Sequence, residues 1–139
     1  MAVYFVDTSF HVAIVDPRDD LHRRALALGR RLDAAGARLV TTDSTLVELL
    51  TFLSGEGEYA RLAASAYVRR VLTDDRIEVV AQSSSLFRSA LALYEQRRDQ
   101  TYSMCDCMSM VVCRERGIRD VLTHDYDFVR EGFSALLRR

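Results

Sequence analysis

The chain has 139 residues, of which 49% are hydrophobic and 28% charged, and its formal net charge is −1. This length is typical of one domain with a sizeable core, so we expect residues 1–139 to form a single domain. The nearly balanced charge excludes a strong overall attraction to nucleic acid or to an anionic membrane. The apolar runs are shorter than the roughly 20 residues of a membrane span, and no signal peptide is recognisable. We therefore expect a cytoplasmic protein with no membrane partner.

Strand and helix signals alternate along the chain. The apolar run at residues 2–6 is typical of a strand that is buried on both faces of a parallel sheet. Further strands are expected at 38–41, 77–80 and 120–123, with a candidate edge strand at 133–137. Helices are expected at 19–35, 43–53, 58–72, 83–98, 103–116 and 126–130. The alternation predicts a Rossmann-like, three-layer α/β/α sandwich around a mainly parallel sheet.

The basic residues and the cysteines add two constraints. All 19 basic residues are Arg, which suits phosphate contacts, although codon bias in a GC-rich genome is the stronger explanation. Cys105, Cys107 and Cys113 are odd in number, which does not suit a disulfide framework. Cys105 and Cys107 would point to different faces of one helix, which argues against a zinc site. We expect all three to be small core residues in a reducing compartment.

Four acidic residues stand in apolar surroundings. Asp7 and Asp125 follow predicted strands, whereas Glu48 lies between leucines and valine and Asp106 between cysteines and methionines. Burying an unpaired carboxylate costs several kcal/mol, and no Lys or Arg adjoins any of the four. Sites in parallel α/β folds form beyond the carboxyl ends of the strands, where these side chains can converge. Mg²⁺ or Mn²⁺ prefers oxygen ligands, so the pattern predicts metal-assisted hydrolysis.

Each of the four also has a purely structural explanation. The segments 45–48 and 103–106 both match a capping box, in which the acidic residue reaches back to the start of its own helix. Asp7 and Asp125 would each cap the segment that follows. These explanations weaken jointly, because the predicted topology brings all four residues to one end of the sheet.

Four ordered motifs resemble those of the PIN-domain family. They are Val6-Asp7-Thr8-Ser9, Thr45-Leu46-Val47-Glu48-Leu49, Tyr102-Ser103-Met104-Cys105-Asp106 and Leu122-Thr123-His124-Asp125-Tyr126-Asp127-Phe128. The resemblance covers nearly the whole chain and is strongest to the single-domain VapC-like toxins of toxin–antitoxin pairs. It implies an Mg²⁺- or Mn²⁺-dependent endoribonuclease that acts on RNA, with a cognate antitoxin protein and frequent homodimers.

The resemblance also assigns roles to individual positions. Asp7, Glu48, Asp106 and Asp125 match the acidic quartet of the family. We expect Asp7 and Asp106 to bind the metal directly, whereas Glu48 and Asp125 would bind a second ion, act through water or orient the nucleophile. Three further matches are supporting positions: the hydroxyl residues Thr8 and Thr123, and the more variable acid Asp127. Cys105 departs from the pattern, because related toxins often have Thr there and a thiol is a poorer hydrogen-bond partner.

The remaining polar candidates are weaker. His124 adjoins Asp125 and is a candidate acid or base, whereas His11 and His22 are expected on helix surfaces. Four arginine pairs form either an RNA-contacting rim or solvated helix faces: Arg23-Arg24, Arg30-Arg31, Arg69-Arg70 and Arg97-Arg98.

The helices at residues 43–72 carry more leucine than one buried stripe needs. The leucines concerned are Leu46, Leu49, Leu50 and Leu53. The surplus predicts either an apolar groove for an antitoxin helix, or a contribution to the core or to a homodimer interface.

Three other functions remain open. A Rossmann-like phosphohydrolase would use Asp7 as its nucleophile, but such sites usually place a second acid two residues later, where this chain has Ser9. A receiver-like or other metal-binding module without turnover would usually need a Lys near its acidic pocket, and the chain has none. A PIN-like nuclease with an RNA-processing role is the third.

Overall fold

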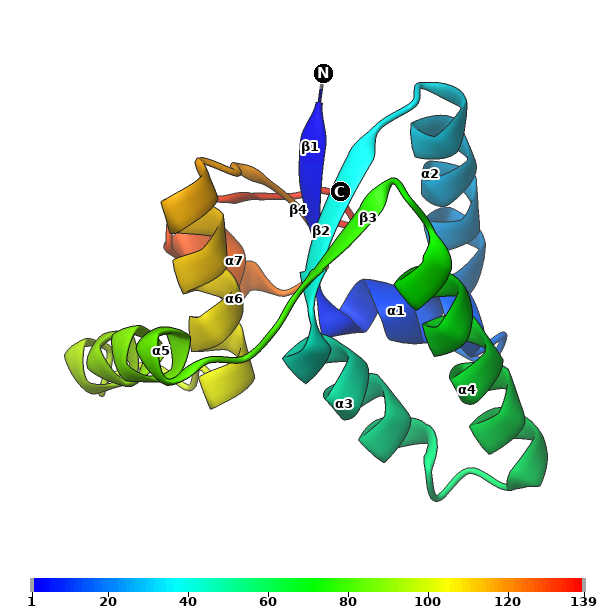
Figure 1. Cartoon of the computed structure of the whole chain (residues 1–139), viewed down its shortest axis with the longest axis horizontal. Helices are drawn as coiled ribbons and strands as arrows, with labels where there is room; N and C mark the ends of the chain where they lie inside the picture. Colours follow the sequence, from blue (N-terminus) through cyan, green and yellow to red (C-terminus); the bar gives the residue numbers. More distant parts are fainter. Residues whose placement is uncertain (1, 139) are drawn as a thin grey trace.

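A five-stranded parallel sheet forms the centre of the computed structural model, which describes residues 2–138 (Figure 1). The strands are β1 (Val3–Val6), β2 (Arg38–Thr42), β3 (Ile77–Val80), β4 (Asp120–Leu122) and β5 (Ser134–Ala135). Their order across the sheet is β3-β2-β1-β4-β5, and every adjacent pair is parallel. The chain adds strands outward from β1 to β3 and then crosses to the other side of β1. The strand order therefore reverses between β1 and β4.

Helices cover both faces of this sheet. They are α1 (Thr8–Val15), α2 (His22–Ala34), α3 (Asp43–Leu53), α4 (Glu58–Thr73), α5 (Ser84–Gln96), α6 (Met104–Arg116) and α7 (Tyr126–Arg130). In Figure 1, α5, α6 and α7 lie on one side of the sheet and α1, α2 and α4 on the other, while α3 extends beyond its carboxyl end. The predicted three-layer α/β/α sandwich is confirmed, and the sheet is parallel throughout the described chain.

The core is divided by the sheet, because successive residues of a strand point to opposite faces. Phe5 and Val121 are buried with Phe128 in the cluster that contains side chains of α5, α6 and α7. Val6 and Leu122, each one residue further, are buried in the cluster formed with α1 and α2. The two central strands are thus covered on both faces, as their apolar sequences predict.

Helix α1 was not among the helices expected from the periodicity of the sequence, although His11 was expected on a helix surface. Its residues include four consecutive buried positions, from Phe10 to Ala13, and are rich in β-branched side chains. A helix that is apolar nearly all round has no polar face, so the 3.6-residue periodicity that reveals an amphipathic helix is absent. Helix α2 begins at His22 rather than at residue 19, and residues between the two helices form turns.

His11, which was expected on a helix surface, is buried instead, with only 1% of its surface exposed. Its Nε2 lies 2.9 Å from Thr41 Oγ1, and its Nδ1 lies 2.6 Å from Tyr67 Oη. Burial lowers the pKa of His11 to about 3, so its imidazole is neutral near pH 7. His22 is partly buried, with Nδ1 2.7 Å from the carbonyl oxygen of Ala13. Both histidines therefore join elements of the fold.

One of the two predicted capping boxes is present. At the start of α6, Ser103 Oγ accepts from the Asp106 amide and Asp106 Oδ2 accepts from the Ser103 amide, each at 3.0 Å. The box predicted at residues 45–48 is wrong, because the N-cap of α3 lies three residues before Thr45. Thr42 is its N-cap and accepts from the Thr45 amide at 3.1 Å. Glu48 is therefore available for a partner outside its own helix.

The three cysteines are buried and free, as predicted. Over residues 2–138, none of the helices combines the length and the apolar character that crossing a membrane requires.

Candidate active site

The site begins where β1 and β4 end, at the point where the strand order reverses. Ligands bind at such a switch point in open α/β sheets, because the loops diverge there and leave a crevice. Val6 pairs with Leu122 in the sheet, so Asp7 and Thr123 emerge side by side. Thr123 Oγ1 donates to Asp7 Oδ2 at 2.8 Å, and Ser9 Oγ donates to the same oxygen at 3.0 Å.

Asp7 is a buried carboxylate, with 5% of its surface exposed. Burial raises the pKa of Asp7, while the hydrogen bonds from Thr123 and Ser9 oppose that rise by stabilising the charged form. Ser9 also lies 3.2 Å from Thr123 through their hydroxyl oxygens. The carboxylate is thus held in one orientation by two hydroxyl groups, one of which belongs to the neighbouring strand end.

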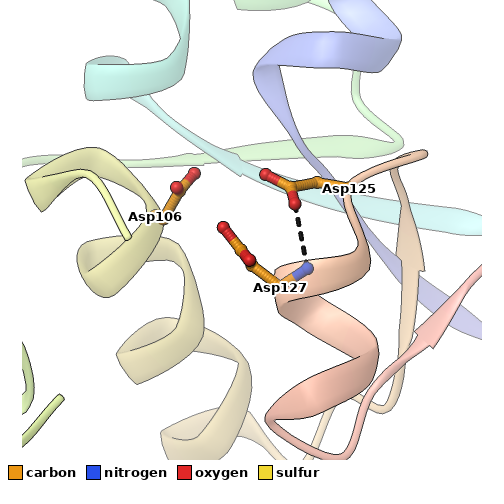
Figure 2. A group of neighbouring side chains, drawn as sticks. All are labelled: Asp106, Asp125 and Asp127. Carbon is orange, nitrogen blue, oxygen red and sulfur yellow. Dashed lines mark hydrogen bonds between the residues drawn. The ribbon is translucent and has the colours of Figure 1, made fainter. Parts of the chain in front are cut away.

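Three other carboxylates form a compact group (Figure 2). Asp106, Asp125 and Asp127 each offer an oxygen, and these oxygens all lie within 4.8 Å of one another. Asp106 comes from the first turn of α6, and Asp125 is the N-cap of α7. Asp125 Oδ1 accepts from the Asp127 amide at 2.9 Å, the contact drawn in Figure 2. The packing of α6 beside α7 therefore brings together acids that are 19 or more positions apart.

Burial, together with repulsion between the carboxylates, changes the titration of this group. Burial raises the pKa of Asp106 to about 7, and the charges of Asp7 and Asp125 contribute to the rise. Burial and the charge of Asp125 also raise the pKa of Asp127. Arg130 Nη1 contacts Asp127 Oδ1 at 2.8 Å and is the one cation paired with these three acids among residues 2–138. The group carries more negative charge than its neighbours balance.

Glu48 is not a member of this group, and its charge acts on Cys105, the residue next to Asp106 in the sequence. Thr8 Oγ1 donates to Glu48 Oε1 at 2.6 Å. Burial, together with the charge of Glu48, raises the pKa of the Cys105 thiol, so Cys105 is protonated. The two hydroxyl residues singled out in the sequence, Thr8 and Thr123, thus each support a different acid.

One contribution was not identified from the sequence, and another was assigned only a supporting role. Ser9 occupies the position that argued against a phosphohydrolase, yet its hydroxyl binds Asp7. Asp127, expected only as a supporting residue, completes the three-carboxylate group. Asp7 is not a member of that group, but its charge raises the pKa of Asp106. The sequence signal for the role of Asp127 was its position two residues after Asp125, at the start of a predicted helix. The His124 side chain is exposed.

The donor set fits a hard divalent cation. All ligand atoms of the group are carboxylate oxygens, which Mg²⁺ and Mn²⁺ prefer over the nitrogen and sulfur ligands that zinc accepts. A cation between the three acids would also relieve the repulsion that raises the pKa of Asp106.

The model of the PIN-domain family matches residues 4–133. The chain belongs to the PIN-domain family. It is 34% identical over 131 residues to the 23S rRNA-specific endonuclease VapC20 of Mycobacterium tuberculosis, covering 93% of this chain and 94% of that protein. It is 25% identical over 105 residues to a VapC ribonuclease of Aquifex aeolicus, covering 76% of this chain and 74% of that one.

Solved structures agree with this assignment. The crystal structure of Mycobacterium tuberculosis VapC20, described as a Sarcin-Ricin loop cleaving toxin, matches with a TM-score of 0.80 and 28% identity, covering 94% of this chain and 95% of that one. VapBC2 from Rickettsia felis, bound to a DNA fragment from its promoter, matches with a TM-score of 0.64 and 16% identity, covering 96% of each chain. The second match shows the fold alone. The resemblance to VapC-like PIN domains that the motifs indicated is confirmed.

Proposed function

We propose that this PIN-domain protein is a metal-dependent endoribonuclease and the toxin of a toxin–antitoxin pair. The observation that carries the proposal is the convergence of Asp106, Asp125 and Asp127, beside Asp7, where the strand order of the sheet reverses. The relatives named as VapC endonucleases support both the activity and the toxin role. A phosphohydrolase is not favoured, because Ser9 binds Asp7 where a second acid would be needed.

Asp106, Asp125 and Asp127 would hold the Mg²⁺ or Mn²⁺ ion, with Asp7 as a further ligand. When bound, such an ion lowers the pKa of a coordinated water and offsets charge on the phosphate. Thr123 and Ser9 keep the Asp7 carboxylate in a fixed orientation. Thr8 fixes Glu48, which is our candidate for orienting the attacking water. Positioning of this kind lowers the barrier because the groups need no rearrangement during the reaction.

The substrate class we propose is RNA, with ribosomal RNA as the first candidate. The relative that is 34% identical acts on 23S rRNA, and the match covers nearly the whole of both chains. The name of that relative identifies its own substrate, so the target of this chain needs a direct test. Incubation with total RNA and Mg²⁺, followed by sequencing of new 5′ ends, would show which RNA is cut and where.

The decisive variant is Asp106→Asn. An Asn oxygen can still accept from the Ser103 amide, so the cap of α6 survives while the negative charge is lost. We expect cleavage to fall by at least ~100-fold with the melting temperature unchanged or higher, because one of several crowded charges is removed. Asp20→Asn is the matched control, since Asp20 is exposed between α1 and α2. Full cleavage by a folded Asp106→Asn protein would exclude the proposed site.

The helices α3 and α4 provide a surface for the antitoxin. Leu46, Leu49 and Leu53 are buried, so three of the four leucines singled out in the sequence complete the core. The open groove is lined instead by Val47, Leu50 and Leu62, together with Thr51, Ser54, Arg61, Ala64 and Ser65. We propose that an antitoxin helix packs its apolar face there.

The position of the groove favours this occupant. Glu48 follows Val47, a residue of the groove, on α3. A basic side chain on the antitoxin helix would therefore reach the acidic site from the groove. Such a contact would silence the enzyme by competing with the metal for the carboxylates. A second copy of the chain is the other candidate occupant, since homodimers are expected from the family resemblance.

Growth assays separate these possibilities. We expect expression of the chain alone to arrest growth, and the product of the small neighbouring gene to restore it. Leu50→Glu with Leu62→Glu should abolish this rescue while RNA cleavage persists, because charge in the groove opposes apolar packing. Leu72→Glu, at an exposed apolar position of α4 outside the groove, should leave rescue intact. Unchanged rescue of the double variant, or its conversion from dimer to monomer, would assign the groove to another role.

A further inference from the structure

A tyrosine and two arginines stand beside the carboxylates. Tyr126 is the first residue of α7 and lies in sequence between Asp125 and Asp127, both members of the acidic group. Its side chain is half exposed. The guanidinium carbons of Arg130 and Arg138 lie 5.2 Å and 5.0 Å from the centre of its ring. Such distances are those of cation–π contacts. Two positive charges are therefore held against one ring at the edge of the candidate active site.

Arg138 is held from several directions. Its Nη1 donates to the backbone oxygen of His124 at 3.2 Å. Arg24 Nη2 donates to the backbone oxygen of Arg138 at 2.9 Å, which fixes the segment that follows β5. Arg130 is paired with Asp127 at 2.8 Å, whereas Arg138 makes no ion pair with any carboxylate of residues 2–138. Its guanidinium is therefore positioned and electrostatically available.

An RNA strand needs such a cation at this place. The chain has a net charge of −1, and the acids at its site repel phosphates. A strand that presents one phosphodiester to the carboxylates also brings the neighbouring phosphates near them. Binding energy for single-stranded nucleic acid comes largely from cationic side chains at those phosphates. Arg suits this purpose because its planar fork donates two parallel hydrogen bonds to one phosphate.

We propose that Arg138, held by Tyr126, forms a phosphate-binding subsite for the RNA strand next to the position of cleavage. Tyr126 is a positioning residue: its ring reduces the freedom of the guanidinium before RNA arrives, so less conformational entropy is lost on binding. The proposal rests on the proposed endoribonuclease function and specifies how its substrate is held. The alternative is that the contacts serve only to fasten the segment after β5 to the sheet.

The test measures steady-state cleavage of the RNA identified above at several salt concentrations. Arg138→Gln removes the charge but keeps an N–H that can donate to the His124 oxygen, so the segment stays fastened. We expect KM to rise about tenfold with kcat changed less than about twofold, because a binding contact away from the reacting atoms is lost. The slope of log affinity against log salt concentration should become less steep by about 1, the change expected when one phosphate contact is lost.

Variants of Tyr126 test the positioning role. Tyr126→Ala should raise KM severalfold, whereas Tyr126→Phe, which keeps the ring, should behave as the unchanged protein. The double variant with Arg138→Gln should be no worse than Arg138→Gln alone, because the ring acts through the guanidinium. Arg88→Ala, which removes one exposed charge from α5, is the control for net charge and should leave KM and the salt slope unchanged.

The outcomes separate this inference from the proposed function. Cleavage by the unchanged protein, with KM and salt slope unaltered in Arg138→Gln, would overturn the subsite and leave the nuclease standing. If Arg138→Gln and Tyr126→Ala lower the melting temperature but leave KM unchanged, the two residues serve only to fasten the segment after β5. That result would also overturn the proposed subsite. If the unchanged protein with Mg²⁺ or Mn²⁺ neither cleaves nor binds RNA, the proposed function fails and the subsite fails with it.

Discussion

Asp106 takes part in two sets of interactions that move its pKa in opposite directions. Burial and the charges of Asp7 and Asp125 raise the pKa to about 7, while the hydrogen bonds with Ser103 at the start of α6 work against that rise. A residue that only capped the helix would have a low pKa, because capping stabilises the charged form. Burial, with a smaller contribution from the neighbouring charges, outweighs the cap, as expected for a carboxyl group that is partly buried among other acids.

The raised pKa predicts how stability depends on pH. The pKa of Asp106 rises from 3.8 to about 7 on folding, so the folded state keeps a proton that the unfolded state releases. The stability associated with that proton is complete below pH 3.8 and is lost as the pH rises to about 7. In EDTA, the contribution of Asp106 to the free energy of unfolding should therefore fall across this interval. The measurement is urea denaturation at a series of pH values.

Asp106→Asn isolates this contribution. His11 acts in the opposite sense, because its pKa is lowered from 6.5 to about 3 and its contribution to stability is lost as the pH falls. The two effects overlap, but the His11 contribution cancels in the difference between the unchanged protein and Asp106→Asn. We expect that difference to grow in favour of the variant between pH 3.8 and about 7. A difference that does not vary with pH would show that Asp106 ionises normally.

Single residues of the site were predictable where the local sequence was anomalous. Asp7, Asp106 and Asp125 are acids in apolar surroundings or at strand ends, and the structure places them near one another. The partners of these acids were less predictable. The bond between Thr8 and Glu48 joins positions 40 apart, and only the packing of α1 against α3 creates it. Sequence patterns report the local environment, whereas hydrogen bonds across the fold depend on the docking of elements.

At the scale of elements, α1 and its neighbours depend on one buried polar contact. His11 of α1 binds Thr41 of β2 and Tyr67 of α4, so three elements meet at a neutral imidazole. The sequence suggested a surface histidine, because a polar residue in an apolar run is usually exposed. Its two ring nitrogens each have a partner, which allows burial without a large desolvation cost. Asp7 is the N-cap of α1, so His11 lies about one helical turn from the candidate site.

Tyr67→Phe tests that contact. The substitution leaves the volume nearly unchanged and removes the partner of His11 Nδ1, so a buried polar atom is left unsatisfied. We expect a loss of about 1–3 kcal/mol in the free energy of unfolding. Tyr59→Phe is the matched control on the same helix, because Tyr59 is 84% exposed, and its effect should stay within about 0.5 kcal/mol. Equal stability of the two variants would mean that water replaces the lost hydroxyl.

At the scale of the whole molecule, alternating strand and helix signals were sufficient for the architecture. They predict a parallel sheet with helices on both faces, and the structure has one. The strand order was not predictable in the same way, because it depends on which side of β1 the chain crosses after α6. That crossing places β4 next to β1 and so joins Asp7 to the Asp125 loop. The homodimer expected from the family resemblance stays a prediction.

Metal binding should link the site to the stability of the entire fold. An ion that binds only the folded state adds RT ln(1 + [L]/Kd), or about 2.7 kcal/mol at a concentration roughly 100-fold above Kd. The melting temperature should therefore rise when Mn²⁺ or Mg²⁺ replaces EDTA, and Asp106→Asn should blunt the rise. The shift should be larger at about pH 8 than at about pH 5.5, because the acids with raised pKa must lose their protons before they bind a cation. Identical melting curves with EDTA and with millimolar Mn²⁺ at the higher pH would contradict a metal site. A shift that persists undiminished in Asp106→Asn would place the ion elsewhere on the molecule.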